Sequence, residues 1–274
     1  MKNMKKLILT ILASSFLLSC STDSASDDSN NPTNTGMLVK TFIDSQGLIS
    51  TFNYNGNKGT YVLDSDGSIS TLTYNGDLII KDEKTGGSGS NYIRTMNYSN
   101  NLLTSSTESR NSNSYSSSYN STYTYNSDGS ITEIRTGTNT YNGNTTNFNS
   151  KYIRFYSQGN CVKEDSYSSI NGVMTLNETT TYTYDSYNFP LKNITGLYAD
   201  QNPQEAASVN NKISETTKNA SGEVILTVQT TYQYNSQNYP ISMTDTITNY
   251  TPDPQTGTWT PETPETYSAT FTYY

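Results

Sequence analysis

Apolar and aromatic positions alternate with polar ones along most of the chain after residue 36. In Tyr119–Tyr125, for example, the tyrosines share one face of an extended segment, and the asparagine and threonines share the other. A two-residue period is that of a β-strand whose two faces meet different surroundings. No stretch of ten residues shows the apolar spacing of an amphipathic helix. The pattern therefore predicts an all-β protein built from antiparallel strands.

A short unit recurs along the same region and marks the expected hairpins. It reads aromatic or apolar, any residue, aromatic, Asn or Asp, a short turn, and then the apolar start of another strand. Clear copies begin at Phe52, Leu72, Tyr123, Tyr182 and Tyr232, and weaker copies begin at Met96 and Arg154. The Asn-Gly and Asp-Gly turns supply the positive φ that tight hairpins need. Residues 37–274 are therefore expected to form one antiparallel meander of hairpin repeats with roughly 14–18 strands, as a large twisted sheet or a barrel.

Composition determines what can fill the interior of such a fold. Only 32% of the residues are hydrophobic, against about 45–50% in ordinary globular domains. The 24 tyrosines argue against disorder, because disordered chains are poor in aromatic residues. Tyrosine rings and β-branched side chains are expected to supply most of the buried apolar surface. Pro190 and Pro240 are expected at strand starts, and Cys161 is expected to be a small buried side chain, with a reactive thiol as the alternative.

The first 36 residues have a different character. Residues 1–19 contain three lysines and then an apolar run of about a dozen residues. This is the pattern of a signal peptide, and the run is too short to span a membrane. The Leu17–Cys20 ending resembles the lipobox of bacterial lipoproteins, which implies cleavage before Cys20 and attachment of lipid to it. Residues 20–36 are then the lipidated cysteine and a flexible polar tether.

The repeated unit resembles the YD repeats of Rhs-type proteins, which build β-hairpin shells. Together with the lipobox and the tether, it also resembles secreted Bacteroidetes-type lipoproteins of unknown function that carry porin-like β domains. The resemblance covers about residues 37–274 and implies a fold and an outer-membrane location, with no catalytic residues to carry over. Asp23, Asp27 and Asp28 resemble the acidic signals that export such lipoproteins to the outer face, so the body is expected at the cell surface rather than on the periplasmic side.

Charge and missing residue types exclude several functions. The chain has no histidine, which removes His-based acid–base catalysis, His-containing triads and His-ligated metals. Its net charge of −8 becomes −11 when Lys2, Lys5 and Lys6 leave with the signal peptide, since 13 basic residues then face 24 acidic ones. Such a chain is repelled by nucleic acid, so membrane attachment is expected to rest on the lipid. No cofactor and no metal site are predicted.

The acidic residues are expected to be charges on solvent-facing positions. The adjacent pairs are Asp82-Glu83 and Glu164-Asp165. Neighbours in a strand point to opposite faces, so neither pair makes a two-carboxylate catalytic site by itself.

A membrane-spanning barrel is not expected. Over residues 267–274, the face shared with the final tyrosine carries serine and threonine, and the other face carries the remaining aromatic and apolar side chains. Outer-membrane barrels usually end with the opposite arrangement. A water-soluble sheet or barrel is therefore predicted.

The best candidates for ligand binding are tyrosines and the single tryptophan. Tyr125, Tyr184 and Tyr234 end the aromatic triplets of three repeats, and their rings suit stacking on sugars or anchoring a protein interface. A cross-strand tyrosine ladder that holds the sheet is the alternative. Trp259 lies in an irregular segment rich in Thr and Pro, where it could contact a ligand or close the end of the fold.

The leading hypothesis is a non-enzymatic binding or scaffolding module, anchored in the outer membrane by lipid, for a glycan or a protein. One alternative is a polysaccharide-active enzyme that uses Asp or Glu together with Tyr. Another is a structural shell or an adhesin-like repeat fragment.

Overall fold

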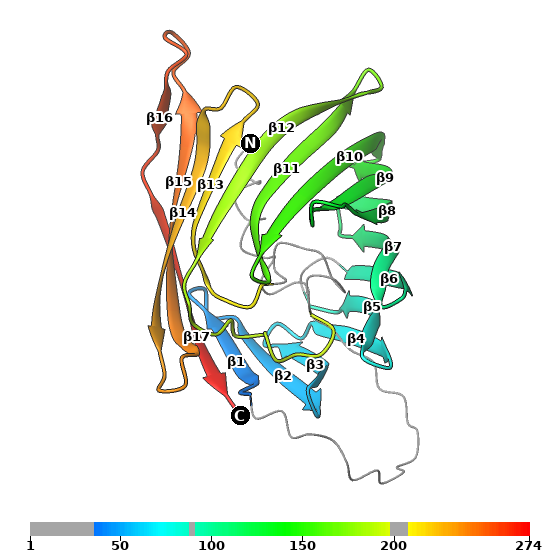
Figure 1. Cartoon of the computed structure of the whole chain (residues 1–274), viewed down its shortest axis with the longest axis vertical. Helices are drawn as coiled ribbons and strands as arrows, with labels where there is room; N and C mark the ends of the chain where they lie inside the picture. The colour runs from blue at the N-terminus through cyan, green and yellow to red at the C-terminus, as the bar shows by residue number, and fades with distance from the viewer. Residues whose placement is uncertain (1–35, 88–90, 198–207) are drawn as a thin grey trace.

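The fold is an antiparallel β-barrel (Figure 1). The computed structural model describes residues 36–87, 91–197 and 208–274. The strands are β1 (Val39–Asp44), β2 (Ile49–Asn55), β3 (Lys58–Asp64), β4 (Ile69–Asn75), β5 (Leu78–Thr85), β6 (Asn91–Ser99), β7 (Leu102–Asn111), β8 (Tyr115–Tyr125), β9 (Ile131–Tyr141), β10 (Asn144–Ser157), β11 (Asn160–Ile170), β12 (Val173–Tyr184), β13 (Lys212–Asn219), β14 (Val224–Tyr234), β15 (Pro240–Pro252), β16 (Trp259–Pro261) and β17 (Glu265–Tyr273). The predicted all-β class and antiparallel meander are confirmed, and the 17 strands of the described residues fall within the expected number.

All strands except β16 close the barrel, which decides between the open sheet and the closed form. Each strand from β1 to β14 pairs antiparallel with its successor, and β17 pairs with both β15 and β1. The closing pair aligns Phe42 with Phe271. β16 forms a short hairpin with the end of β15 and lies at the upper end in Figure 1. Closure removes the unpaired sheet edges that would otherwise invite aggregation.

The two faces of the barrel wall carry different side chains. In β8, Ser121 and Tyr123 are buried and point inward, whereas Thr122 points outward and is exposed. In β17, Ala269 and Phe271 are buried inside, and the serine and threonines at 266, 268, 270 and 272 are exposed outside. The interior therefore receives aromatic, aliphatic and ionised side chains, and much of the outer wall presents hydroxyl and amide groups.

The repeated tyrosines gather at one end of the barrel, here called the tyrosine end, where the turns after the even-numbered strands β2 to β14 lie. Several of these tyrosine hydroxyls donate to a backbone carbonyl on the strand that comes just before their own in the chain. That earlier strand belongs to the preceding hairpin. The pairs are Tyr54 to Val39 (2.9 Å), Tyr98 to Ile79 (2.7 Å), Tyr125 to Leu103 (3.1 Å) and Tyr184 to Cys161 (2.6 Å). The strand register also shifts beside Tyr54, Tyr98 and Tyr184, and such bulges increase local twist. Each of these units thus ties its hairpin to the one before.

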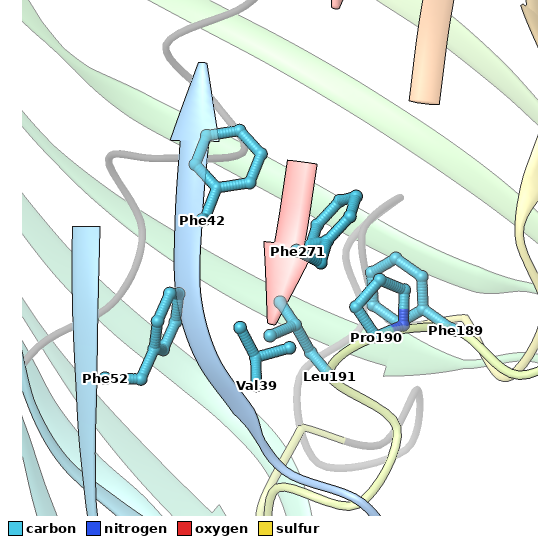
Figure 2. A pocket seen from close by; sticks show the side chains of 7 residues that line it. All are labelled: Val39, Phe42, Phe52, Phe189, Pro190, Leu191 and Phe271. Carbon is cyan, nitrogen blue, oxygen red and sulfur yellow. The ribbon is translucent and has the colours of Figure 1, made fainter. Parts of the chain in front are cut away.

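A segment between β12 and β13 fills the tyrosine end. This plug segment, residues 185–197, contains successive turns, and it buries Leu191 and Ile194 in a hydrophobic core cluster. The Thr195 N–H donates to the Asn57 carbonyl (2.9 Å), and the Tyr74 hydroxyl donates to the Thr195 carbonyl (3.1 Å). A residual apolar cavity of about 20 Å³ lies between the plug segment and the wall; Figure 2 shows its lining by Val39, Phe42, Phe52, Phe189, Pro190, Leu191 and Phe271. The tyrosine end is therefore packed with side chains.

Two of the expectations for single residues can be judged from this packing. Pro240 begins β15 as expected, but Pro190 lies in the plug segment, so its placement at a strand start was wrong. The apolar residues around Pro190 pack against the inner wall instead of continuing the sheet. Cys161 is fully buried on β11, as predicted. Among the described residues, no helix has the length and apolar character needed to cross a membrane.

Candidate functional site

The four ligand-binding candidates lie at opposite ends of the barrel. Tyr125 and Tyr184 are at the tyrosine end, where their hydroxyls donate to backbone carbonyls. Tyr234 is also there, and its hydroxyl donates to the Asp185 carboxylate of the plug segment. Burial and this hydrogen bond raise the pKa of Tyr234. Trp259 is half-buried on β16 at the other end, so the structure does not gather the four into one site. The predicted lipid attachment residue, Cys20, lies outside the described residues.

The adjacent acidic pairs divide between the two faces of the wall, as strand geometry predicted. Asp82 and Glu164 point into the barrel, and Glu83 and Asp165 point outward. However, the expectation that acidic side chains occupy solvent-facing positions was wrong for several of them. Cations and hydroxyls on the same or neighbouring strands satisfy most of these carboxylates and make their burial tolerable. The buried set is Asp64, Asp82, Glu108, Glu133, Asp165 and Asp245.

Glu133 on β9 is the centre of an ionic cluster on the inner wall. Its Oε1 accepts hydrogen bonds from Ser121 Oγ (2.6 Å) and from Nε and Nη2 of Arg135 (3.2 and 2.9 Å). Its Oε2 accepts from Arg154 Nη1 (2.9 Å), and Arg154 Nε donates to Glu164 Oε2 (2.5 Å). Burial by itself would raise the pKa of Glu133, but the two guanidinium groups outweigh it and lower that pKa to about 2. Glu133 is therefore a permanent anion that holds two arginines in place.

Asp82 on β5 begins a second cluster that joins the first. Cross-strand register places Asp82 opposite Arg94, and Arg94 opposite Glu108. The Tyr92 hydroxyl donates to Asp82 Oδ2 (2.9 Å), whereas Oδ1 has no hydrogen-bond partner among the described residues. Burial raises the pKa of Asp82 to about 7, although Arg94 opposes the rise. Arg94 Nη2 donates to the Tyr123 hydroxyl (3.1 Å), and the same hydroxyl donates to Glu133 at the centre of the first cluster.

Tyrosine and arginine side chains alternate across five neighbouring strands of the same inner wall. We call the set Tyr92, Arg110, Tyr119, Arg135 and Tyr152, from β6 to β10, the aromatic–arginine row. The guanidinium carbon of Arg110 lies 4.8 Å from the ring centre of Tyr92. That of Arg135 lies 4.6 Å from the ring centre of Tyr119 and 4.9 Å from that of Tyr152. Each such contact contributes roughly 0.5–2 kcal/mol, so Arg135 is held between two rings.

The arginines of the row are more accessible than the carboxylates that hold them. The side chains of Arg110 and Arg135 are 37% and 25% exposed, against 6% for Glu108 and 1% for Glu133. Arg110 donates to Glu108 through Nε (2.6 Å), and Arg135 donates to Glu133 through Nε and Nη2. Within the described part of the chain, both Nη groups of Arg110 and Nη1 of Arg135 have no hydrogen-bond partner. These donors are free to meet a ligand.

A glycine permits the close packing of the aromatic rings in this region. Gly137 on β9 is paired with Tyr119 on one side and with Phe148 on the other. A Cβ atom on Gly137 would lie 2.1 Å from the Ser118 carbonyl oxygen and 2.4 Å from Tyr119 Cβ. The Tyr119 and Phe148 rings pack edge to face with their centres 6.0 Å apart. The missing side chain therefore lets the two rings lie close to the wall.

Beyond the row, the inner wall becomes more accessible toward the end opposite the plug segment, here called the rim end. Tyr92, Arg110, Ser117, Asn139 and Thr146 are successive cross-strand partners on strands β6 to β10, so they lie in one line across the inner wall. The last of them, Thr146, is exposed. These last positions carry small polar side chains, and the strands around them are less buried than near the plug segment. The row therefore borders an accessible part of the inner wall.

The groups on this wall suit noncovalent contacts. In residues 36–87, 91–197 and 208–274, no group of three His, Cys, Asp or Glu side chains could hold a metal ion. The row presents ring surfaces and hydrogen-bond donors, backed by buried carboxylates.

Sequence reasoning did not single out the aromatic–arginine row. The parity of β9 could have found part of it, because Glu133 and Arg135 share the face of Ile131, which starts the strand after a Ser-Asp-Gly turn and is buried. A charged residue in phase with the apolar face of a strand predicts an inward charge that needs a partner.

Two solved structures are similar to this chain. A porin-like protein from Bacteroides vulgatus has a TM-score of 0.54 at 11% sequence identity, and the match covers 86% of this chain and 99% of that chain. A porin-like protein from Bacteroides uniformis has a TM-score of 0.45 at 14% identity, with 87% and 95% covered. No model of a known protein family and no curated protein match the sequence. At 11% identity, the similarity to the Bacteroides vulgatus protein shows a shared β-barrel fold and nothing further.

Proposed function

We propose that the chain is a lipid-anchored protein of the outer membrane whose barrel is a water-soluble, non-catalytic module that binds a glycan or a protein on its inner wall. Cys20 carries the lipid, and the body faces the outside of the cell. The observation that carries the proposal is the contrast between the two faces of the wall. The inner wall has accessible rings and arginines, and the outer wall has long rows of Ser, Thr and Asn.

Two observations support a location in the envelope. The first is the signal-peptide pattern with its lipobox-like ending at Cys20. The second is the barrel fold shared with a Bacteroides vulgatus protein described as porin-like. The kinship to YD repeats rests on the repeated unit, whose tyrosines link consecutive hairpins.

The composition of the outer wall favours water over lipid as its surroundings. A membrane-spanning barrel needs an outward apolar band about 25 Å tall. The outward positions of β8 and β17 carry Ser, Asn and Thr instead. Exposed apolar side chains do occur on the outside of β2, β3, β4 and β6. These exposed side chains are Ile49, Tyr61, Leu63, Ile69 and Ile93. Leu63 faces Ile69 and Ile49 faces Ile43 across neighbouring strands, and Thr and Asn occupy other outward positions beside them.

The ionic clusters support binding rather than catalysis. A polysaccharide hydrolase needs a protonated acid and an ionised carboxylate on the two sides of the bond that it cleaves. Glu108, Glu133 and Glu164 each accept a hydrogen bond from an arginine, which suits anchoring more than proton transfer. Asp82 has the raised pKa of an acid, but it is buried and bonded to Tyr92.

A protease site placed in the tether tests the proposal. A recognition sequence inserted within residues 21–36 would allow membranes that contain the full chain to be cut between lipid and body. We expect cleavage to release residues 37–274 into the soluble fraction without detergent. A body that stays in the membrane pellet after complete cleavage would refute the water-soluble barrel. A Cys20→Ser variant, followed by metabolic labelling with a fatty-acid analogue, tests the lipid separately and should lose the label.

A further inference from the structure

We infer that the aromatic–arginine row binds a neutral oligosaccharide across strands β6 to β10. The inference rests on the proposed function and specifies the ligand class of its inner wall. It is carried by three features of the row: partly exposed rings, unused guanidinium donors, and a balanced charge.

The rings supply a surface for stacking. Tyr119 and Tyr152 are half-buried, so part of each side chain faces the accessible interior. Phe148 is half-buried as well and packs edge to face against Tyr119. The apolar faces of sugar rings, lined by C–H groups, pack against aromatic surfaces of this kind. Gly137 keeps the wall flat between Tyr119 and Phe148, because it has no side chain to stand between them.

The guanidinium groups supply donors for sugar hydroxyls. Both Nη groups of Arg110 and Nη1 of Arg135 have no protein acceptor among the described residues, while the Nε atoms are fixed by Glu108 and Glu133. A guanidinium that is already fixed by a carboxylate loses little entropy when it donates to a ligand. The geometry therefore offers preorganised donors beside the stacking surfaces.

The balance of charge selects a neutral ligand. Around the row, four guanidiniums face four carboxyl groups: Arg94, Arg110, Arg135 and Arg154 against Asp82, Glu108, Glu133 and Glu164. Three of these carboxylates accept a hydrogen bond from an arginine, whereas burial raises the pKa of Asp82 to about 7, so Asp82 completes the balance only above that pH. The border of the row adds an acid, because Glu178 lies on the same inward register as Tyr152, two strands further along. Burial and the nearby Glu164 raise the pKa of Glu178. An anionic ligand would have to compete with carboxylates that already hold the arginines.

The spacing of the rings favours a chain of sugars over a single sugar. The partly exposed rings of Tyr119 and Tyr152 stand on alternate strands, β8 and β10. Alternate strands of a sheet lie about 9–10 Å apart. A monosaccharide can cover one of these rings only, whereas an oligosaccharide can reach from one to the next. Affinity is therefore expected to rise with chain length.

Calorimetric titration of the full-length protein in detergent micelles tests this inference. The probes are neutral β-1,4-glucan, xylan, mannan and α-1,4-glucan oligosaccharides of graded length, with oligogalacturonates as the acidic comparison. At least one neutral series is expected to bind more tightly as it lengthens. Tyr119→Ala should weaken that binding by about tenfold, and Arg110→Lys should weaken it severalfold because lysine keeps the charge and loses the fork. Tyr61→Ala, on the exposed outer wall, is the matched control and should bind as wild type does.

The outcomes separate this inference from the proposed function. It is overturned if no neutral series binds, if the oligogalacturonates bind more tightly, or if Tyr119→Ala binds like wild type. If Tyr119→Ala does not fold, as judged by circular dichroism, unchanged binding by Arg110→Lys overturns it instead. A protein ligand with no saccharide binding would also overturn it. Release of the body after tether cleavage, combined with no saccharide binding, refutes this inference alone, whereas retention in the membrane refutes the proposed function.

Discussion

Replacement of Glu133 by Gln should destabilise the barrel more than any comparable change on its outer wall. The carboxylate is 1% exposed and joins Ser121, Arg135 and Arg154. Glutamine keeps the shape of the side chain and one acceptor oxygen, but it removes the charge that the two guanidiniums face. Arg154, whose side chain is 7% exposed, would then lose this carboxylate and keep its ion pair with Glu164.

The magnitude follows in two independent ways. Removing one partner of a buried ion pair costs about 3–5 kcal/mol. The pKa of Glu133 falls from 4.5 to about 2 on folding, and this difference corresponds to about 3 kcal/mol at neutral pH. For a chain of this size, each kcal/mol shifts the melting temperature by about 2–4 °C. Glu133→Gln should therefore lower the free energy of unfolding by about 3–5 kcal/mol and the melting temperature by at least about 6 °C.

The pH dependence gives the same prediction a sharper form. Because the folded-state pKa of Glu133 lies below the unfolded value, its contribution is fully present above pH 4.5 and is lost as the pH falls toward 2. Wild type and Glu133→Gln should therefore differ most near neutral pH and converge as the pH approaches 2.

Urea unfolding of the full-length protein in detergent, followed by circular dichroism across this pH range, measures both effects. Glu83→Gln is the control, because Glu83 lies outside, is 23% exposed and pairs with Lys81; exposed pairs contribute about 0–1 kcal/mol. The reasoning is refuted if Glu133→Gln unfolds within 1 kcal/mol of wild type at neutral pH, or if the two curves stay parallel down to pH 2.

Three further predictions use the same unfolding assay. Asp82→Asn should stabilise the protein at pH 8 by at most about 4 kcal/mol. Because the pKa of Asp82 in the folded protein is about 7, ionisation of this side chain costs stability as the pH rises from about 4 through 7. The gain should therefore vanish near pH 4, and a variant less stable than wild type at pH 8 would contradict the prediction. Gly137→Ala should cost about 1–3 kcal/mol, because its Cβ would overlap the neighbouring strand, and wild-type stability would show that the wall can shift. Tyr98→Phe should lower the free energy of unfolding by about 0.5–1.5 kcal/mol, because it removes the hydrogen bond to the Ile79 carbonyl. Tyr61→Phe on the outer wall is the control and should not change it measurably. Equal effects of the two substitutions would argue against a stabilising role of the Tyr98 hydroxyl.

The hairpins could be predicted because their signals are local. The period of two in Tyr119–Tyr125 and the Asn-Gly and Asp-Gly turns each lie within a few residues. Closure of the barrel could not be predicted, since it depends on the pairing of β1 with β17 at the two ends of the described chain. The plug segment was also missed, because Phe189, Pro190 and Leu191 read like the start of another strand until the inner wall that they pack against is known.

The inner wall was missed for a different reason. In most soluble proteins charges lie outside, but here Ser and Thr fill many positions of the outer wall, and Arg94, Glu108, Glu133 and Arg154 point inward. Strand parity gives the relative face of such residues. It does not say which charges meet across strands, because Glu133 and Arg154 come together only through the register of β9 with β10 and the reach of their side chains.

Cysteine labelling in isolated outer membranes tests the central claim most directly. Thr122→Cys places a thiol on the exposed outward face of β8, and the buried Cys161 of the parent chain serves as the unreactive background. If the barrel stands in water at the end of a lipid tether, Cys at position 122 should react with a membrane-impermeant maleimide equally fast before and after detergent is added. Protection that ends only when detergent dissolves the membrane would place the outer wall in lipid and contradict the account.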